Sequence, residues 1–521
     1  MTTSVTSTTR LAALAPASEQ EWLESARALI LDADLDGAFA FFLAAAAQYP
    51  ASGEVRIGLA GLYWQMQQHE QAEALLRDWL AQCPDHVGAT FLLARMLREQ
   101  GRMRAAAEVI RKLFEHGRHD VDTVIQAIET LDDYGRPQDA AAICEAEIAT
   151  GSTDPRIHAY AGMLDIQLGE FPRVRERYNF ALGHSPEAVE WNIPIGLSGL
   201  QRYQDSSHPD FALFHEVLSR PRLSDKARTT TLFALAKAHD DIADHAQAAR
   251  YLHEANALAH AAGSWSRKQW NRSVEARLAD RPYPFALPAP VDWVPIFIVG
   301  VPRSGTTLLA ELLTRHPQVL NRGELGCIRM LAQQLALADR NEKLPFEQAA
   351  AVYAAQLRQD DSEAHWFIDK QPLNLLHVDL IMALWPNARI IHCQRHARDT
   401  ALSLWSQSFH DRAHDYAYDL GDIGAVIHGC RRLAKRWNAR YPESFHTVRY
   451  EDLVAAPVDI MAALNDWLEL PVTQSSITLR EPHAISTASA WQARQPVHAR
   501  SAGRWRDYAP YLPELLRIPD R

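Results

Sequence analysis

The strongest constraint on the fold of this chain is a 34-residue period that runs through its first half. Glycines recur with this spacing at Gly101, Gly135 and Gly169. Three other positions of the period carry one class of residue each. They are a small position (Ala38, Ala72, Ala106, Ala140, with Val174 next), a bulky apolar position (Phe42, Leu76, Ile110, Cys144, Tyr178) and a proline position (Pro50, Pro84 and, three periods later, Pro186). The period predicts two antiparallel helices per repeat, and each repeat buries its apolar face against the next.

This period and these residue classes resemble the tetratricopeptide repeat. Glycine permits the turn between two helices, and alanine lets the helices approach closely. We expect an all-α repeat solenoid over residues 21–280, after a flexible tail at residues 1–20. The period blurs after residue 186, and a further unit is expected at 232–258, with Asp244 at its inter-helix turn. A peptide or protein partner is expected on the repeats, and a purely structural platform is the alternative.

A proline-rich segment ends the helical half, because prolines block helix propagation. We therefore expect a linker at 281–294 and a second domain at 295–521. Apolar runs follow at 296–301, 366–370, 388–395 and 445–453, and they alternate with expected helices at 373–384, 399–409, 424–440 and 457–469. This alternation predicts a three-layer α/β domain with a parallel sheet, whose carboxyl-end edge carries the ligand site. The whole chain is thus expected to be multidomain, α followed by α/β.

The segment PIFIVGVPRSGTTLL joins the first of these runs to a helix. A strand, a glycine-containing turn and a helix point backbone N–H groups at an anion. Gly300 and Gly305 have the spacing of the two glycines in the triphosphate-binding motif G-x-x-x-x-G-K-[ST], but Thr306 stands at the position of its lysine. Hydroxyl groups and an arginine add donors and charge. This P-loop-like turn is expected to bind phosphate or sulfate through Arg303, Ser304, Gly305, Thr306 and Thr307.

The PRSGTT sequence resembles the 5′-phosphosulfate loop of sulfotransferases, which use 3′-phosphoadenosine 5′-phosphosulfate (PAPS) as donor. The segment CQRHARDTALSLW (393–405) resembles the 3′-phosphate motif of that family, with Arg395 after an expected strand and Ser403 on the following helix. An arginine and a hydroxyl that converge on one phosphate make charge-assisted hydrogen bonds. The resemblance implies PAPS as co-substrate and no metal. We interpret the cluster HDRAHDY (410–416) as a solvated loop near the acceptor opening rather than a zinc site.

Two further segments resemble the catalytic part of tyrosylprotein-type sulfotransferases. In NRGELGCIRML (321–331), Glu324 is implied to take the proton of the acceptor hydroxyl. In FIDKQPLNLLHV (367–378), Lys370 is implied to stabilise charge on the sulfonate and the bridging oxygen, together with Arg303. The alternatives are a helix-capping role for Glu324 and a solvent-facing Lys370.

The C-terminal segments resemble the rest of the cofactor site. VRYEDLV (448–454) resembles a segment whose tyrosine contacts the adenine, which implies this role for Tyr450; a half-buried structural tyrosine is the alternative. In STASAWQARQPVHARSAGRW (486–505), Ser489 matches a catalytic-site serine. Gln495 stands at the family's basic position, so Arg494 is implied to reach the cofactor instead. The residues SAGRWR (501–506) resemble the closure over the 3′-phosphate.

Composition excludes several classes of function. The formal net charge of −11 argues against a general nucleic-acid binder. The five scattered cysteines lack metal-ligand spacing and indicate free thiols in a reducing compartment. The most apolar stretch, at 38–47, is far shorter than the ~20 residues that span a bilayer. We therefore expect a cytoplasmic protein with no membrane span and no nucleic-acid partner.

The repeat period and the motifs together resemble tetratricopeptide-repeat sulfotransferases from about residue 25 to the end of the chain. The implied reaction is in-line transfer of a sulfonate group from PAPS to an acceptor hydroxyl or amine. Protein tyrosine, carbohydrate, lipid and small-molecule acceptors stay open. An NTP-dependent phosphotransferase is one alternative, although the missing loop lysine argues against it. A repeat scaffold with an inactive transferase domain is the other.

Overall fold

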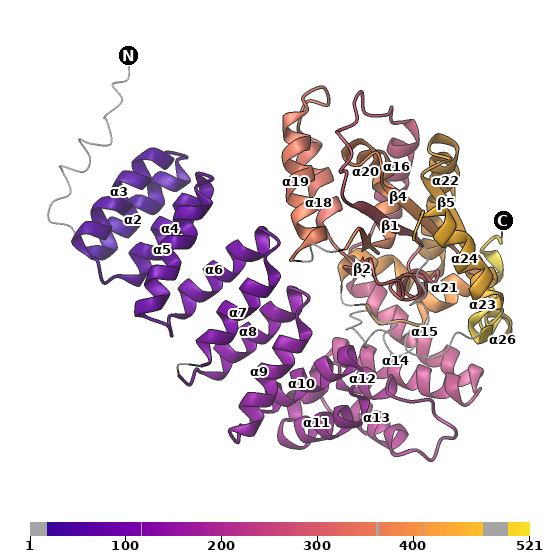
Figure 1. The fold of residues 1–521 in the computed structure, drawn as a ribbon. Helices are drawn as coiled ribbons and strands as arrows, with labels where there is room; N and C mark the ends of the chain where they lie inside the picture. Colours follow the sequence, from indigo (N-terminus) through magenta and orange to yellow (C-terminus); the bar gives the residue numbers. More distant parts are fainter. Residues whose placement is uncertain (1–17, 116, 361–363, 410, 472–498, 521) are drawn as a thin grey trace. The chain divides into compact units, whose positions relative to one another are not determined.

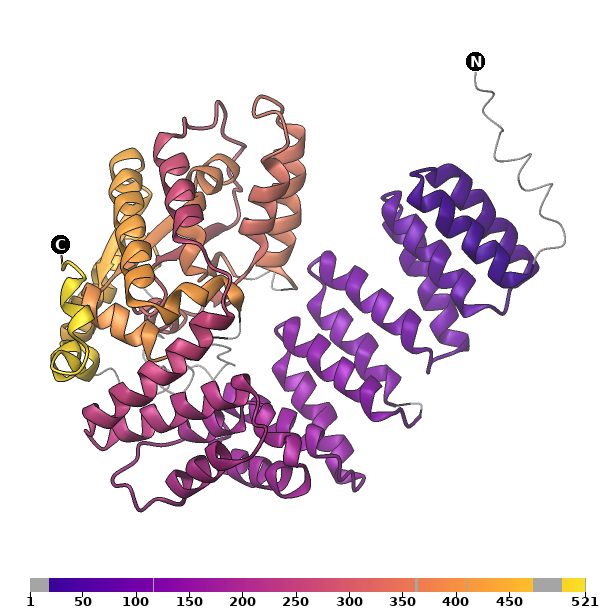
Figure 2. The ribbon, with the colours of Figure 1, turned by 180° about the vertical axis from the view of Figure 1, so that it is seen from behind.

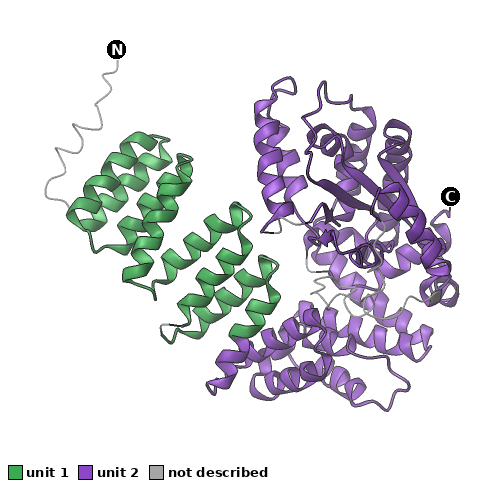
Figure 3. Cartoon of the chain, viewed as in Figure 1, with its two compact units in different colours: residues 1–143 green, residues 144–521 purple. Residues whose placement is uncertain are grey.

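The computed structural model describes residues 18–115, 117–360, 364–409, 411–471 and 499–520 (Figure 1). The chain divides into two compact units, residues 1–143 and residues 144–521 (Figure 3). The division falls within one helix, α9 (Pro137–Ala149). The later helices of the first half therefore form one compact unit with the sheet.

Residues 19–184 form five helical hairpins with a constant period. The first helices of the hairpins begin 34 residues apart, and so do the second helices. The pairs are α2 (Glu19–Leu31) and α3 (Leu35–Gln48), α4 (Gly53–Gln65) and α5 (His69–Gln82), α6 (Val87–Glu99) and α7 (Met103–Leu113), α8 (Val121–Asp133) and α9, and α10 (Pro155–Leu168) and α11 (Phe171–His184). The alanine register is fully buried where these helices cross. The predicted helical repeat region is confirmed.

The turn inside each hairpin uses one residue in the left-handed region. Glycine occupies this position in three repeats, for example Gly101 at φ 77°. The first two repeats adopt the same conformation with Ala33 and Gln67, at φ 60° and 62°. A Cβ atom makes this conformation less favourable, so the turn is set by the packing of the two helices rather than by glycine alone. In the later unit Ala243 takes this conformation. Asp244 lies in the turn between α14 and α15, as expected, and caps α15 by accepting from Gln247 N.

After residue 184 the period is lost, as expected. A 3₁₀ turn η1 (Pro186–Glu190) and the short helix α12 (Ile193–Ser198) precede α13 (Pro209–Ser219). Three longer helices follow: α14 (Asp225–Asp241), α15 (His245–Ala262) and α16 (Arg267–Ala279). Side chains of these last three helices belong to the same apolar core as one face of the sheet. Both ribbon views show α14 and α15 beside the C-terminal helices (Figures 1 and 2).

The C-terminal part is a five-stranded parallel sheet with the strand order β2-β3-β1-β4-β5. Its strands are β1 (Val294–Gly300), β2 (Val319–Asn321), β3 (Trp366–Asp369), β4 (Arg389–Gln394) and β5 (Phe445–Arg449). Alternate residues of β1 face two different cores: Phe297 and Val299 face one, and Ile296 and Ile298 face the other. The sheet is therefore covered on both faces, which confirms the predicted α/β class.

Helices cover the two faces and continue to the C-terminus. They are α17 (Thr306–Leu313), α18 (Cys327–Leu335), α19 (Leu344–Arg358), η2 (Pro372–His377), α20 (Val378–Leu384), α21 (Ala397–Trp405), η3 (Arg412–Tyr418), α22 (Leu420–Arg440), α23 (Tyr450–Ala455), α24 (Pro457–Trp467), η4 (Ala499–Ser501), α26 (Trp505–Tyr508) and η5 (Pro513–Arg517). Strand β2 and helices α18 and α19 were not predicted. The expected strand at 445–453 ends at Arg449, and Tyr450 begins a helix instead.

The proline-rich segment is packed against the α/β domain. Leu287 N donates to Ala383 O (2.8 Å), and Leu287 and Trp293 are buried. Phe285 makes an edge contact with Phe346 of α19. The prolines stop the helix, but apolar side chains between them fix this segment to the domain that follows.

Candidate active site

The turn between β1 and α17 is held in an unusual backbone conformation. Gly300 and Gly305 have φ values of 148° and 100°, and Arg303 has φ 71°. A Cβ atom at Gly300 would lie 2.5 Å from the carbonyl oxygen of Cys393 in β4. At Gly305 it would lie 2.6 Å from the Tyr450 ring. Glycine is therefore needed at both positions, because the end of β4 and Tyr450 press directly on the loop.

The hydroxyl side chains of the loop lie at the start of α17. Ser304 and Thr306 are buried, and Thr307 is half-buried on the helix. Ser304 Oγ has no hydrogen-bond partner among the described residues. Buried polar atoms are normally paired, so this hydroxyl marks a place where a ligand oxygen fits. The position at a helix N-terminus favours an anionic ligand.

The residues predicted to bind the nucleotide converge on this loop. Arg303 Nε donates to Ser403 Oγ (3.1 Å). Arg395 donates to the carbonyl oxygens of Arg303 (3.0 Å) and Ser501 (2.6 Å). Its guanidinium lies 4.7 Å from the centre of the Tyr450 ring. The fold thus brings together side chains that are about 150 residues apart along the chain.

Positive charge accumulates at this point. Burial, together with the nearby charges of Arg395 and Arg504, lowers the pKa of Arg303 to about 10. Burial is also the main cause that lowers the pKa of Arg395, with Arg504 contributing. Because the charged forms of Arg303 and Arg395 are disfavoured in this way, an anion bound here would stabilise them.

Glu324 and Lys370 form an ion pair at the carboxyl end of β3. Lys370 Nζ lies 2.5 Å from Glu324 Oε1. The Lys370 side chain is 1% exposed, whereas that of Glu324 is 37% exposed, so the carboxylate is the member open to an incoming group. Glu324 also lies close enough to Arg303 to act on its pKa. The pair therefore stands beside the loop, and Lys370 does not point to solvent.

The buried carboxyl group of Asp369 supports this pair and was missed by sequence reasoning. It accepts from Tyr353 Oη (2.5 Å), Asn374 Nδ2 (2.9 Å), Gln371 N (2.9 Å) and Leu325 N (3.4 Å). Burial raises the pKa of Asp369 to about 7, although these hydrogen bonds oppose the shift. The bonds to residues 325 and 371 fix the backbone next to Glu324 and Lys370. The position of Asp369 at the end of an expected strand was the sequence feature that could have identified it.

A second missed carboxylate, Asp399 at the start of α21, holds the C-terminal segment against the loop. It is buried and accepts from Gly503 N (2.7 Å) and Trp505 N (3.0 Å). Trp505 stacks on His396, with the ring planes 5° apart. The segment SAGRWR therefore lies next to Arg395, and Arg504 is placed near the other two arginines. The predicted residues Ser489 and Arg494 lie outside the described residues.

The cluster at 410–416 differs from its prediction as a solvated loop. Residues 412–418 form η3, and Tyr416 is buried with its hydroxyl unpaired among the described residues. Asp415 accepts from Ser264 N (3.0 Å), which ties η3 to the turn after α15. Burial raises the pKa of Tyr416 and lowers the pKa of His414, and the charge of Glu324 acts to raise the pKa of each. Apolar and aromatic packing buries Tyr416, whereas Asp411 and Arg412 of the same cluster are exposed. Among the described residues, no group of three or more His, Cys, Asp or Glu side chains is arranged to hold a metal ion.

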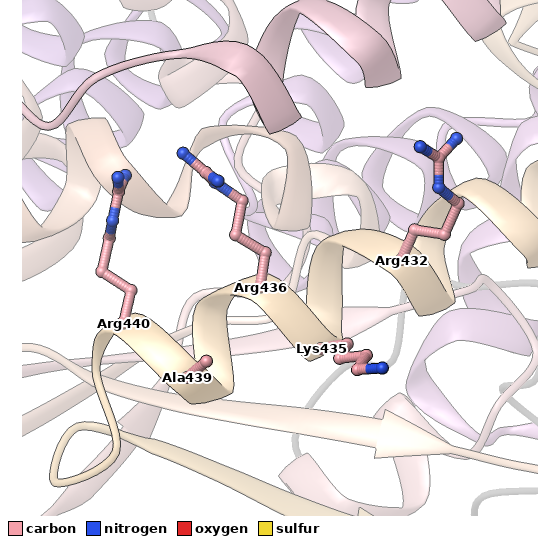
Figure 4. Close-up of a pocket in the computed structure, with 5 residues that line it drawn as sticks. All are labelled: Arg432, Lys435, Arg436, Ala439 and Arg440. Atoms are coloured by element: carbon pink, nitrogen blue, oxygen red, sulfur yellow. The ribbon is translucent and has the colours of Figure 1, made fainter.

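A separate pocket on α22 is lined by cationic side chains but is not a second anion site. Figure 4 shows Arg432, Arg436 and Arg440 pointing to one side of the helix and Lys435 to the other. Each arginine has a local acceptor: the Glu275 carboxylate, Asp280 O (2.6 Å) and the Asp379 carboxylate (2.6 Å), respectively. These contacts fasten α22 to the end of α16 and to α20.

Comparison with known proteins agrees with the two-part architecture. Residues 295–474 match the model of the sulfotransferase family, and residues 29–87 match the tetratricopeptide repeat. An uncharacterized protein of Aquifex aeolicus is 24% identical over 96% of this chain and 69% of its own length. The protein-tyrosine sulfotransferase of Drosophila melanogaster is 25% identical over 40% of this chain and 46% of its own length. The sulfotransferase domain of the Synechococcus olefin synthase aligns with 43% of this chain and 90% of that domain, at 21% identity and a TM-score of 0.33.

The chain therefore consists of N-terminal tetratricopeptide repeats followed by a sulfotransferase-family domain. That domain is distantly related to protein-tyrosine sulfotransferases. This chain spans about half the length of the fly protein. None of the described helices is both long and apolar enough to cross a membrane.

Proposed function

We propose that this protein is a PAPS-dependent sulfotransferase that transfers a sulfonate group to an acceptor hydroxyl. The observation that carries the proposal is the convergence of the β1–α17 loop, the arginines and the Lys370–Glu324 pair at one edge of the sheet. Arg303, Arg395 and the unpaired Ser304 hydroxyl suit a ligand with two separated anionic groups, as PAPS has.

The residues suggest a role for each group in an in-line displacement. The acceptor oxygen attacks sulfur and forms the new S–O bond, while the bond from sulfur to the bridging phosphate oxygen breaks. Glu324 takes the hydroxyl proton. The leaving phosphate oxygen keeps the electron pair, and Lys370 and Arg303 stabilise its charge. The products are the sulfated acceptor and adenosine 3′,5′-bisphosphate. Ser489 and Arg494 stay predicted contributors.

A phenolic hydroxyl is the first acceptor to test. Relatives of the domain are named protein-tyrosine sulfotransferases, which favours tyrosine in a peptide or protein. The tetratricopeptide repeats favour a protein partner as well. Carbohydrate and small-molecule hydroxyls are the competing acceptors, and they serve as comparison substrates in the assay.

The experiment is transfer of radiolabel from [³⁵S]PAPS to a panel of tyrosine peptides, sugars and phenols. Parallel samples contain [γ-³²P]ATP with Mg²⁺, which tests the phosphotransferase alternative. We expect ³⁵S-labelled product and no ³²P-labelled product. Labelling from ATP alone would replace the proposed reaction with phosphoryl transfer. Binding of adenosine 3′,5′-bisphosphate without transfer to any acceptor would favour an inactive transferase domain on a repeat scaffold.

A further inference from the structure

The helix α14, far upstream of the sheet in sequence, makes a direct contact with the arginine cluster. Asp240 lies near the C-terminal end of α14 and forms an ion pair with Arg504 (2.6 Å). Its other carboxylate oxygen accepts from Tyr508 Oη (2.6 Å). Arg504 in turn lies close enough to Arg303 and Arg395 to lower the pKa of both. One carboxylate therefore fixes the third arginine of the anion site.

The position of Asp240 is unfavourable for local helix stability. A carboxylate near a helix C-terminus meets the negative end of the helix dipole. The neighbouring Asp241 is used locally, because it accepts from Lys237 Nζ (2.5 Å) and Tyr203 N (3.0 Å). Asp240 instead bonds to residues that follow it by more than 260 positions. Its contacts serve the C-terminal segment rather than its own helix.

The C-terminal segment is held from two sides. Asp399 accepts from the backbone N–H groups on either side of Arg504, and Asp240 holds the Arg504 side chain. Burial opposes the charged form of Arg504, but attraction to Asp240 raises its pKa above the ordinary value. The backbone contacts with Asp399 and the side-chain ion pair with Asp240 together fix the orientation of Arg504. Arg504 then lies beside Arg395, the residue matched to the 3′-phosphate.

We infer that Asp240 of α14 is a positioning residue for nucleotide binding, which holds Arg504 in place to contact the 3′-phosphate of PAPS. The helical region before the sheet is thereby part of the cofactor site and not only a scaffold. This inference rests on the proposed function, since it assumes a nucleotide with a 3′-phosphate. A fixed guanidinium binds phosphate more tightly than a mobile one, because less conformational entropy is lost on binding.

The test compares two nucleotides that differ only in the 3′-phosphate. Calorimetry measures the Kd of adenosine 3′,5′-bisphosphate and of adenosine 5′-phosphate for the wild type and for Asp240→Asn. We expect the substitution to weaken the bisphosphate about 10-fold, which corresponds to about 1.4 kcal/mol. Binding of the monophosphate should change less than about 2-fold, because Arg504 is assigned to the missing phosphate.

Three variants separate positioning from general stability. Asp240→Glu keeps the charge and is expected to restore much of the bisphosphate affinity. Tyr508→Phe removes one hydrogen bond to Asp240 but keeps the ion pair, so it should cause a smaller loss and provides the test if Asp240→Asn does not fold. Asp241→Asn is the matched control, because Asp241 accepts hydrogen bonds from Lys237 and Tyr203 rather than from Arg504.

The outcomes are distinguishable. Equal loss of both nucleotides, or loss of neither, in Asp240→Asn overturns the inference while the proposed function stands. Failure of the wild type to prefer the bisphosphate overturns the proposed use of PAPS, and the inference falls with it.

Discussion

The two ends of the candidate active site handle charge in opposite ways. At the loop end, burial and the charge of nearby Arg504 lower the pKa of both Arg303 and Arg395. At the other end, Lys370 and Glu324 form a pair of opposite charge. The loop end is thus complementary to an anion, whereas the pair is balanced before any ligand arrives. In the proposed mechanism, Arg395 and Arg504 contribute nucleotide affinity, the Glu324–Lys370 pair contributes the chemistry, and Arg303 contributes to both.

The largest effect is expected from Glu324→Gln, which removes the proposed base while keeping the shape of the side chain. We expect kcat for sulfonate transfer to fall about 10²–10⁴-fold. The Kd of adenosine 3′,5′-bisphosphate should stay within about 3-fold of the wild type, because the arginines are intact. Glu342→Gln, at an exposed carboxylate between α18 and α19, is the control. A wild-type kcat for Glu324→Gln would end the assignment of chemistry to this pair.

The next largest effect concerns the loop end. Arg395→Lys keeps a positive charge but loses the planar fork that reaches two carbonyl oxygens and stacks on Tyr450. We expect the Kd of adenosine 3′,5′-bisphosphate to rise about 10–100-fold, with a small change in kcat at saturating PAPS. Arg389→Lys, at the other end of β4, should leave the Kd unchanged. If kcat falls and the Kd does not, affinity and chemistry are not divided as proposed.

A smaller effect is expected on stability, and it tests the backbone conformation of the loop rather than its side chains. Gly305→Ala forces a Cβ atom into the left-handed region and against the Tyr450 ring, 2.6 Å away. We expect the free energy of unfolding to fall by about 1–3 kcal/mol in urea denaturation. Gly326→Ala is the matched control, because its φ is −74° and a Cβ there meets no atom within 4 Å. Equal stability of the two variants would contradict the close contact with Tyr450.

Measured per pH unit, the smallest change is expected from a pH dependence of stability at the pair end. The folded state holds the Asp369 proton up to about pH 7, while the unfolded chain releases it near the ordinary value of 3.8. The folded state therefore binds more protons between these values, and stability falls as the pH rises through this window, by at most about 1.4 kcal/mol per pH unit. Urea denaturation of Asp369→Asn at pH 5, 6 and 7 should give a flatter profile than the wild type. An identical slope would show that Asp369 is ionised in the folded protein.

Prediction from the sequence succeeded where a feature depends on neighbours along the chain. The helical hairpins follow from local apolar spacing, and four strands of the sheet follow from apolar runs. Strand β2 was missed because three residues are too few to show a pattern. The segment at 412–418 was misjudged because its polar sequence gives no sign of the aromatic packing that buries Tyr416.

The residues missed in the candidate site share one property. Asp240, Asp369 and Asp399 are carboxylates whose partners lie elsewhere along the chain or in the backbone. A single aspartate carries no sequence signal for such a role. Asp369 is the last residue of β3 and Asp399 lies on the helix that follows β4, so the edge rule for parallel sheets identifies their neighbourhood but not their bonds.

The sequence by itself determined the repeat period, the α/β class and the loop that prepares an anion site, because these depend on short-range spacing and on glycine conformation. Only the tertiary structure decided which charges meet. Arg303, Arg395 and Arg504 come together, and Asp240 reaches Arg504, through packing of distant segments against one sheet edge. Electrostatic interactions depend on distance in space, and the sequence gives only distance along the chain.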